Sequence, residues 1–192
     1  MSLVEQAQQA AAEYLRAGGL ALDATVGNGR DTLFLAGLAD RVYGFDIQDR
    51  ALAQAGALLA RHGLETRAEL FLASHADMAA YLPAAVKGRV KAAMFNLGYL
   101  PGGDKRIITR TEATLAALRQ ALDYLEAPGI VTVLAYPGHA GGDAESEAVA
   151  AFCAALPPGL TCRVAEGVKP GPAAKPLKSP RLYMIRKSLD LI

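Results

Sequence analysis

The sequence is poor in the residues that typify metalloproteins and disulfide-stabilised secreted proteins. Its 192 residues include no tryptophan, two cysteines and three histidines. Cys153 and Cys162 form no Cys-x-x-Cys motif and the histidines are scattered, so their spacing predicts neither a metal site nor a disulfide framework. Two reduced, buried thiols in a cytoplasmic protein are the simpler expectation.

The chain also lacks long apolar runs and an excess of charge of either sign. Arginine, aspartate or glutamate interrupts every apolar run before it could cross a bilayer, and residues 1–6 do not begin a secretory signal. The net charge of +1 gives no global attraction to nucleic acid, so an RNA partner would have to be held by a local patch. Hydrophobic residues make up 52% of the chain, which favours a single globular α/β domain over residues 1–192.

Short apolar runs alternate with helical patterns along nearly the whole chain. This alternation predicts right-handed crossovers and a parallel sheet with helices on both faces. Four prolines between residues 169 and 180 exclude a helix there, so the last two strands are expected to form an antiparallel hairpin. Seven strands are predicted, at residues 20–24, 41–46, 67–73, 90–95, 129–135, 161–166 and 181–187, with helices at 3–17, 31–39, 49–62, 76–82, 109–126 and 143–156.

Two helix starts carry capping signals. Thr109 and Glu112 have the spacing of a capping box, in which each side chain accepts a hydrogen bond from a free amide at the start of the helix. Asp49 is placed to cap the start of the helix predicted at 49–62, and Gly63 is placed to end the same helix.

The segment most informative about function runs from Leu20 to Thr32. An apolar run ends at Asp23, the loop Gly27-Asn28-Gly29 follows, and an amphipathic segment begins at Asp31. That order is strand, tight loop and helix. Glycines let the backbone turn sharply and approach a ligand at a helix N-terminus, so we expect a ligand to lie across the start of this helix.

The neighbouring residues narrow the choice of ligand. Asp46 ends the next strand, where an acid that binds ribose hydroxyls is expected, and Ile47 and Gln48 offer an apolar surface and an amide to an adenine ring. The dinucleotide fingerprint needs glycine or alanine where this chain has Thr32. Asp31 would repel a pyrophosphate but favour the sulfonium or ammonium of S-adenosylmethionine.

Each of these interpretations has a simpler alternative. Asp31 could only cap its helix, and Asp46 could be a turn residue. His75, close to the end of the strand predicted at 67–73, is as consistent with a structural histidine as with a ligand contact.

A second set of candidate site residues follows the strand predicted at residues 90–95. The Asn96 side-chain oxygen and the Leu97 carbonyl could orient the hydrogens of an amine that accepts a methyl group, a reaction that depends mainly on positioning. Tyr99 could stack on a flat substrate or close the pocket. Asp104 is the nearest carboxylate that could take up a proton, although it could equally be a turn residue.

Four segments of the chain resemble one known family. They are DATVGNGRDTLFLA (23–36), FDIQ (45–48), FNLGYLPGGDK (95–105) and YPGHAGG (136–142). The chain resembles the family labelled "putative rRNA methylase", which consists of class I S-adenosylmethionine-dependent methyltransferases, over about residues 20–155. The resemblance implies a Rossmann-like fold. It also implies cofactor contacts from Asn28, Asp31, Asp46, Gln48 and His75, and substrate-side roles for Asn96, Tyr99 and Asp104.

The family includes a tRNA enzyme that methylates the 5-aminomethyl group of the wobble 2-thiouridine, so the resemblance implies the tRNA anticodon arm as a partner. Lys105, Arg106 and Arg110 are candidates for holding it, more than the loop of residues 169–180. This chain departs from the family at Arg30, where histidine is frequent, and in that loop.

Together these observations predict an S-adenosylmethionine-dependent N-methyltransferase. The predicted catalytic residues are Asn96, Tyr99 and Asp104; the predicted cofactor contacts are Gly27, Asn28, Gly29, Asp31, Thr32, Asp46, Ile47, Gln48, His75 and Asn96. Alternative substrates are rRNA or a small-molecule amine. Alternatives of another class are a nicotinamide-binding protein and a non-catalytic S-adenosylmethionine-binding protein. The segment 3–17 could cover the sheet, dock a partner subunit in a homodimer, or close over the substrate.

Overall fold

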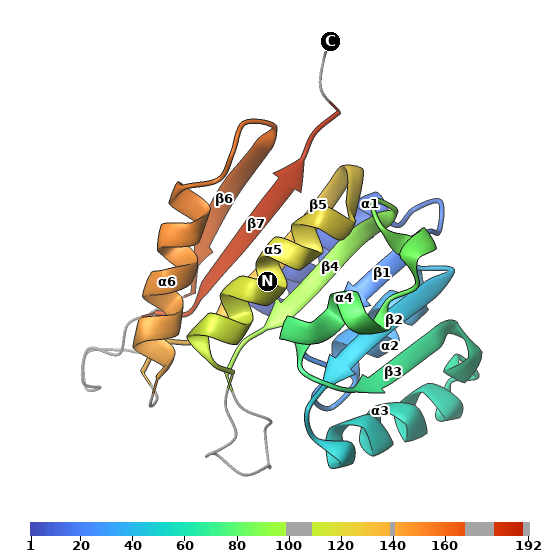
Figure 1. Cartoon of the computed structure of the whole chain (residues 1–192). Coiled ribbons are helices and arrows are strands. Elements are labelled where there is room, and N and C mark those ends of the chain that lie inside the picture. The colour runs from blue at the N-terminus through green and yellow to red at the C-terminus, as the bar shows by residue number, and fades with distance from the viewer. Residues whose placement is uncertain (99–108, 139–140, 168–178, 190–192) are drawn as a thin grey trace.

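The structure is a computed structural model that describes residues 1–98, 109–138, 141–167 and 179–189. Its strands are β1 (Leu20–Asp23), β2 (Arg41–Asp46), β3 (Ala68–Leu72), β4 (Val90–Asn96), β5 (Leu125–Ala135), β6 (Leu160–Glu166) and β7 (Arg181–Lys187). They form one seven-stranded sheet in the order β3-β2-β1-β4-β5-β7-β6 (Figure 1). All seven strands agree with the prediction from the sequence, within a few residues at their ends.

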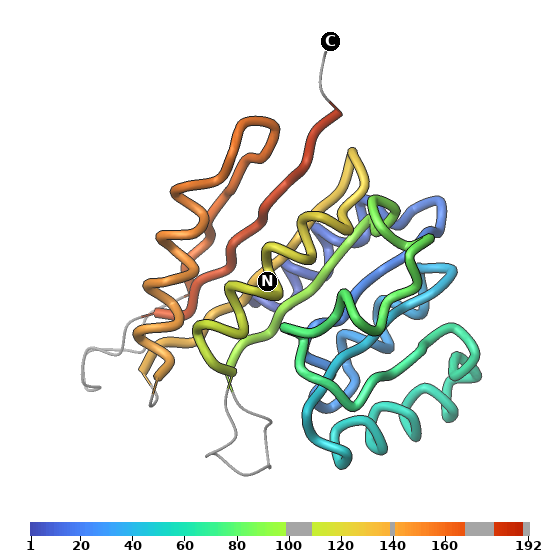
Figure 2. Tube along the Cα trace, in the orientation of Figure 1, coloured from blue at the N-terminus to red at the C-terminus, as the bar shows by residue number. Residues whose placement is uncertain are grey.

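The directions of the strands also match the prediction. β1 to β5 pair in parallel, and β7 runs antiparallel to both β5 and β6. The chain therefore returns from β6 into the space beside β5, which can be followed along the orange and red part of the trace (Figure 2). A mostly parallel sheet with an antiparallel C-terminal hairpin is confirmed.

The helices are α1 (Leu3–Tyr14), α2 (Arg30–Ala36), α3 (Asp49–Arg61), α4 (Met78–Tyr81), α5 (Thr111–Tyr124) and α6 (Gly142–Ala154). Short 3-10 turns lie at Glu65–Arg67, His75–Asp77 and Ala84–Val86. The predicted helix at 76–82 is thus a 3-10 turn followed by a single α-helical turn. In the described part of the chain, no helix is long and apolar enough to span a membrane.

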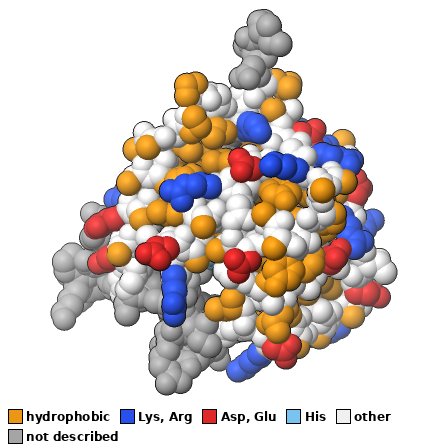
Figure 3. Space-filling model, in the orientation of Figure 1, with side chains coloured by type: hydrophobic (Ala, Val, Ile, Leu, Met, Phe, Trp, Pro, Cys, Tyr) orange, Lys and Arg blue, Asp and Glu red, His pale blue; other side chains and the backbone are white. Residues whose placement is uncertain are grey.

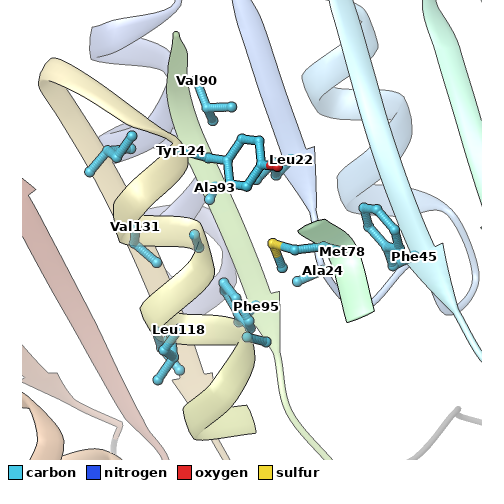
Figure 4. Packing of buried hydrophobic residues seen from close by; sticks show 14 of the residues in the cluster. Leu22, Ala24, Phe45, Met78, Val90, Ala93, Phe95, Leu118, Tyr124 and Val131 are labelled. Atoms are coloured by element: carbon cyan, nitrogen blue, oxygen red, sulfur yellow. The ribbon is translucent and has the colours of Figure 1, made fainter. Parts of the chain in front are cut away.

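Two apolar cores lie on opposite faces of the sheet because successive strand side chains point to opposite sides. In β4, Ala92 and Met94 belong to the core under α1, α2 and α3, whereas Ala93 and Phe95 belong to the core under α4, α5 and α6. Figure 4 shows the second core between β4 and α5. α1 packs on β4, β5 and β7, so the N-terminal segment covers the sheet, one of its three predicted roles.

Both predicted helix caps are wrong, although Gly63 follows the end of α3 in the left-handed conformation as expected. Asp49 is the first residue of α3 rather than its N-cap, where its charge still lies at the positive end of the helix dipole. α5 begins at Thr111, and its N-cap Arg110 makes no side-chain cap. The Thr109 hydroxyl instead bonds to Glu145 of α6, a partner distant in sequence.

Candidate cofactor and acceptor site

The loop after β1 needs both of its glycines. Gly27 and Gly29 have φ values of 52° and 76°, in the left-handed region that favours glycine. A Cβ on Gly29 would lie 2.6 Å from the Cα of Ala55 in α3, so the close approach at this position is to a neighbouring helix. Asn28 is half-buried between the two glycines, and Arg30, which begins α2, is exposed.

Asp46 connects the loop after β1 to the turn after β2. One carboxylate oxygen accepts the Gly27 N–H at 2.9 Å, and the other accepts the Gln48 N–H at 2.9 Å. The bond to Gln48 is that of a turn residue, and the bond to Gly27 goes beyond that alternative. Because each carboxylate oxygen has two acceptor positions, Asp46 can still accept bonds from both hydroxyls of a ribose.

An exposed apolar surface lies beside Asp46 at the end of β2 and β3. Ile47 is 57% exposed, and Leu72, which pairs in register with Asp46, is 56% exposed. Exposed aliphatic side chains at the carboxyl edge of a parallel sheet suit the face of a flat ring. The sequence did not single out Leu72, because nothing in the apolar run of β3 distinguishes its last residue.

Asp31 is buried and held by the N-terminal helix. Gln8 of α1 donates its side-chain N–H to the Asp31 carboxylate at 2.8 Å. Asp31 lies inside α2, whose N-cap is Gly29 and has no side-chain cap, so the capping alternative is wrong. Burial, with a smaller effect from the Asp31 charge, raises the pKa of Tyr136, a residue just after β5. Nothing in the sequence distinguishes Gln8 from the other polar residues of its amphipathic helix.

A third carboxylate lies beneath the loop. Asp23 is 1% exposed and accepts the Thr32 hydroxyl at 2.6 Å and the Thr25 N–H at 3.1 Å. Burial, followed by the nearby charge of Asp31, raises the pKa of Asp23 to about 7. Thr32 is fully buried, so its side chain supports Asp23 below the loop.

His75 is a buried histidine that joins two segments of the site. Its Nδ1 lies 3.0 Å from the carbonyl oxygen of Ala24, so the N–H on that nitrogen donates the bond. Burial lowers the pKa of His75, which favours the neutral ring. The ring also packs against Phe95 of β4, with 6.0 Å between the ring centres. These contacts match the structural alternative for this residue.

The predicted acceptor segment, residues 96–98, is anchored to the loop between β1 and α2 (residues 24–29), which is called the cofactor loop below. Asn96 ends β4 with an exposed side chain, and its N–H donates to the Thr25 hydroxyl at 2.7 Å. The Leu97 N–H donates to the Leu134 carbonyl of β5 at 2.9 Å. One hydroxyl therefore couples the acceptor segment to the loop that follows β1. Tyr99, Asp104, Lys105 and Arg106 lie outside the described residues.

The structure thus brings most of the predicted residues to one edge of the sheet. At the carboxyl edge of the sheet, β1 is followed by the loop of Gly27 to Gly29 and then by Asp31 in α2. At the same edge, β2 ends in Asp46 and β4 ends in Asn96. The carboxylates of Asp31 and Asp46 near one loop favour a ligand with positive charge. Among the described residues no cluster of side chains could hold a metal ion, and both cysteines are free and half-buried.

Two features define the class of protein: β7 lies antiparallel between β5 and β6, and a glycine loop after β1 bonds to an acid at the end of β2. They are those of a class I S-adenosylmethionine-dependent methyltransferase. A family model described as "Putative rRNA methylase" matches residues 42–168. The chain belongs to this family, as its motifs predicted.

Three relatives illustrate the similarity. A structure described as a "putative rRNA-methylase" from Clostridium thermocellum is 36% identical, with a TM-score of 0.86 over 97% of this chain and 98% of that one. A "putative methyltransferase" from Streptococcus mutans, in complex with SAH, is 33% identical, with a TM-score of 0.82 over the same shares of the two chains. The chloroplastic tRNA (mnm(5)s(2)U34)-methyltransferase of Arabidopsis thaliana is 38% identical over 156 residues, 76% of this chain. The chain spans 56% of that relative's length.

Proposed function

We propose that this protein transfers a methyl group from S-adenosylmethionine to an amino group on RNA, and specifically to the 5-aminomethyl group of a wobble uridine in tRNA. The observation that carries the proposal is the bond from the Asn96 N–H to the Thr25 hydroxyl, which couples a polar acceptor segment to the cofactor loop. The 38% identity to a tRNA wobble-uridine methyltransferase supports the choice of substrate.

The residues of the crevice fit the proposed cofactor. Asp46 keeps acceptor positions for the ribose hydroxyls, and Ile47 and Leu72 offer an apolar surface to the adenine. The carboxylate of Asp31 favours the charged methionine end. The other proposed contacts with the cofactor come from Gly27, Asn28, Gly29, Gln48 and His75. Thr32 acts indirectly, through its hydrogen bond to Asp23. When bound, S-adenosylmethionine supplies an electrophilic methyl group.

The acceptor segment would hold a neutral amine. We assign to the Asn96 side-chain oxygen and the Leu97 carbonyl the task of accepting the amine hydrogens, so that its lone pair faces the cofactor. Tyr99 and Asp104 remain proposed partners, one for stacking and one for taking up a proton.

RNA would be held by local contacts. On the face of the molecule with α4, α5 and α6, basic side chains are scattered among acidic and apolar ones (Figure 3). Arg30 and Arg110, both exposed, stand at the starts of α2 and α5, next to the crevice edge. We assign to them contacts with the phosphates of an anticodon loop, whose unstacked bases can enter a pocket.

Two experiments test this proposal. Unfolding temperatures with S-adenosylmethionine, its demethylated product and NAD should rise with the first two only; stabilisation by NAD alone would overturn the cofactor assignment. Purified protein should then methylate tRNA that carries 5-aminomethyl-2-thiouridine, detected by mass spectrometry of nucleosides. Methylation of rRNA or of a small amine, with tRNA unchanged, would replace the substrate.

An Asn96→Ala variant tests the assigned residue. Turnover should fall while the affinity for S-adenosylmethionine stays nearly intact, because the removed amide faces the amine. Equal losses of turnover and affinity would move Asn96 into the cofactor site. Leu97 contributes only backbone groups and offers no equivalent variant.

A further inference from the structure

Glu145 is a buried carboxylate that the predicted site does not include. It lies in the first turn of α6 and is 3% exposed. One oxygen accepts the Thr114 hydroxyl and the other accepts the Thr109 hydroxyl, each at 2.6 Å. Burying a carboxylate is costly unless its oxygens are hydrogen-bonded, and hydroxyl bonds of this length are strong. Glu145 therefore fixes the direction of both hydroxyls.

The bond to Thr109 continues to the acceptor segment. Because the Thr109 hydroxyl donates its only hydrogen to Glu145, its lone pairs remain free to accept, and one accepts the Gly98 N–H at 2.9 Å. The Thr109 N–H in turn donates to the Gly98 carbonyl at 2.9 Å. An unbroken series of hydrogen bonds thus runs from Glu145 to Gly98, two positions beyond Asn96.

Among the described residues, the bond to Thr114 has no such continuation. Thr114 is fully buried within α5, and its N–H bonds to the Arg110 carbonyl in the first turn of the helix. Its hydroxyl therefore holds α5 against α6, which lie side by side (Figure 1). One carboxylate binds two threonines, and only Thr109 contacts the segment that follows β4.

We propose that Glu145 is a positioning residue for methyl transfer, which holds the segment from Asn96 to Gly98 through the Thr109 hydroxyl. Within the described part of the chain, the segment then has three anchors: Thr25 of the cofactor loop, Leu134 of β5, and Thr109 backed by α6. The inference rests on the proposed function in giving Asn96 the task of orienting the amine.

The two threonines provide a matched pair of variants. Thr109→Val and Thr114→Val each remove one hydroxyl from the same carboxylate with almost no change of shape. Thr109→Val should lower kcat for tRNA methylation about 10- to 100-fold, because small misplacements of reacting groups carry losses of that size. Thr114→Val should change kcat by less than about 3-fold. The dissociation constant of S-adenosylmethionine should stay within about 2-fold in both.

Glu145→Ala extends the comparison. It should reproduce the kcat loss of Thr109→Val, and combining the two substitutions should add little, because both break the same series of bonds. Thr109→Val and Thr114→Val could instead lower kcat by similar factors, with each loss following the fall in that variant's unfolding temperature. In that case the carboxylate only stabilises the fold and the proposal is wrong.

A measurement without substrate separates this inference from the proposed function. The Gly98 amide should exchange with solvent about 5-fold faster in Thr109→Val than in wild type, the change expected for loss of one hydrogen bond, and Thr114→Val should leave it unchanged. If wild type methylates no tRNA, the proposed function fails, while this comparison still decides whether Glu145 holds the segment. Equal exchange in the two variants would overturn the inference.

Discussion

Replacing Asp23 with asparagine should remove much of the pH dependence of stability that this carboxyl group imposes. Asp23 is buried beneath the cofactor loop, and burial raises its pKa from 3.8 to about 7. Asparagine has nearly the same shape and no charge at any pH. Its oxygen can accept the Thr25 N–H, and its amide can donate to the Thr32 hydroxyl, so both hydrogen-bonded neighbours keep a partner.

The sign of the effect follows from proton binding. Between about pH 4 and pH 7 the unfolded chain has released this proton and the native chain still holds it, so wild-type stability falls as pH rises through this window. Above about pH 7 the full cost is present, about 4 kcal/mol for a shift of this size. From pH 5 to pH 8 the variant should therefore gain about 2 to 3 kcal/mol relative to wild type.

Urea unfolding of both proteins without ligand, at pH 5, 6, 7 and 8, measures this difference. Other titrating groups are common to the two proteins and cancel in the comparison. Thr32→Val is a second test, because the Thr32 hydroxyl holds the pKa of Asp23 down, and its removal should extend the loss of stability to higher pH. If the stability of wild type and Asp23→Asn changes in parallel from pH 5 to pH 8, Asp23 does not titrate as argued.

Three further predictions concern the loop and its supports. Asp31→Asn should raise the dissociation constant of S-adenosylmethionine about tenfold and that of its uncharged-sulfur product less, measured by calorimetry; equal losses would contradict an electrostatic role. Gln8→Ala removes the hydrogen-bond donor to Asp31 and should raise the dissociation constant of S-adenosylmethionine about 3- to 10-fold with unchanged helix content. An unchanged dissociation constant would show that Asp31 needs no support. Gly29→Ala should lower the unfolding temperature by at least about 4 °C, because its Cβ would meet Ala55 and its φ is positive; an unchanged temperature would mean that α3 can shift.

The sequence was sufficient for the fold because the signals for the sheet are local. Apolar runs such as those of β2 and β5 lie between glycines, prolines and charged residues, and the prolines before β7 exclude a crossover helix. The glycine loop and Asp46 also follow strands directly, so their common edge could be inferred from the alternation of strands and helices.

The supports of the site could not be predicted in the same way. Gln8, Leu72 and Glu145 gain their roles from neighbours far away in the sequence, which only the folded chain brings close. Thr109 shows the cost of local reasoning: its spacing to Glu112 is that of a capping box, but the buried carboxylate of α6 takes its hydroxyl. A tertiary partner outweighed the local signal.

The position of β7 has a consequence for the order in which the protein can be assembled during synthesis. β7 follows β6 in the chain but lies between β5 and β6 in the sheet. Until residues 181–187 have left the ribosome, β5 has an unpaired edge and β6 has no strand to pair with. Open edges of this kind are templates for aggregation. The sheet can therefore become continuous only after residue 187 has left the ribosome, and until then the edge of β5 stays open.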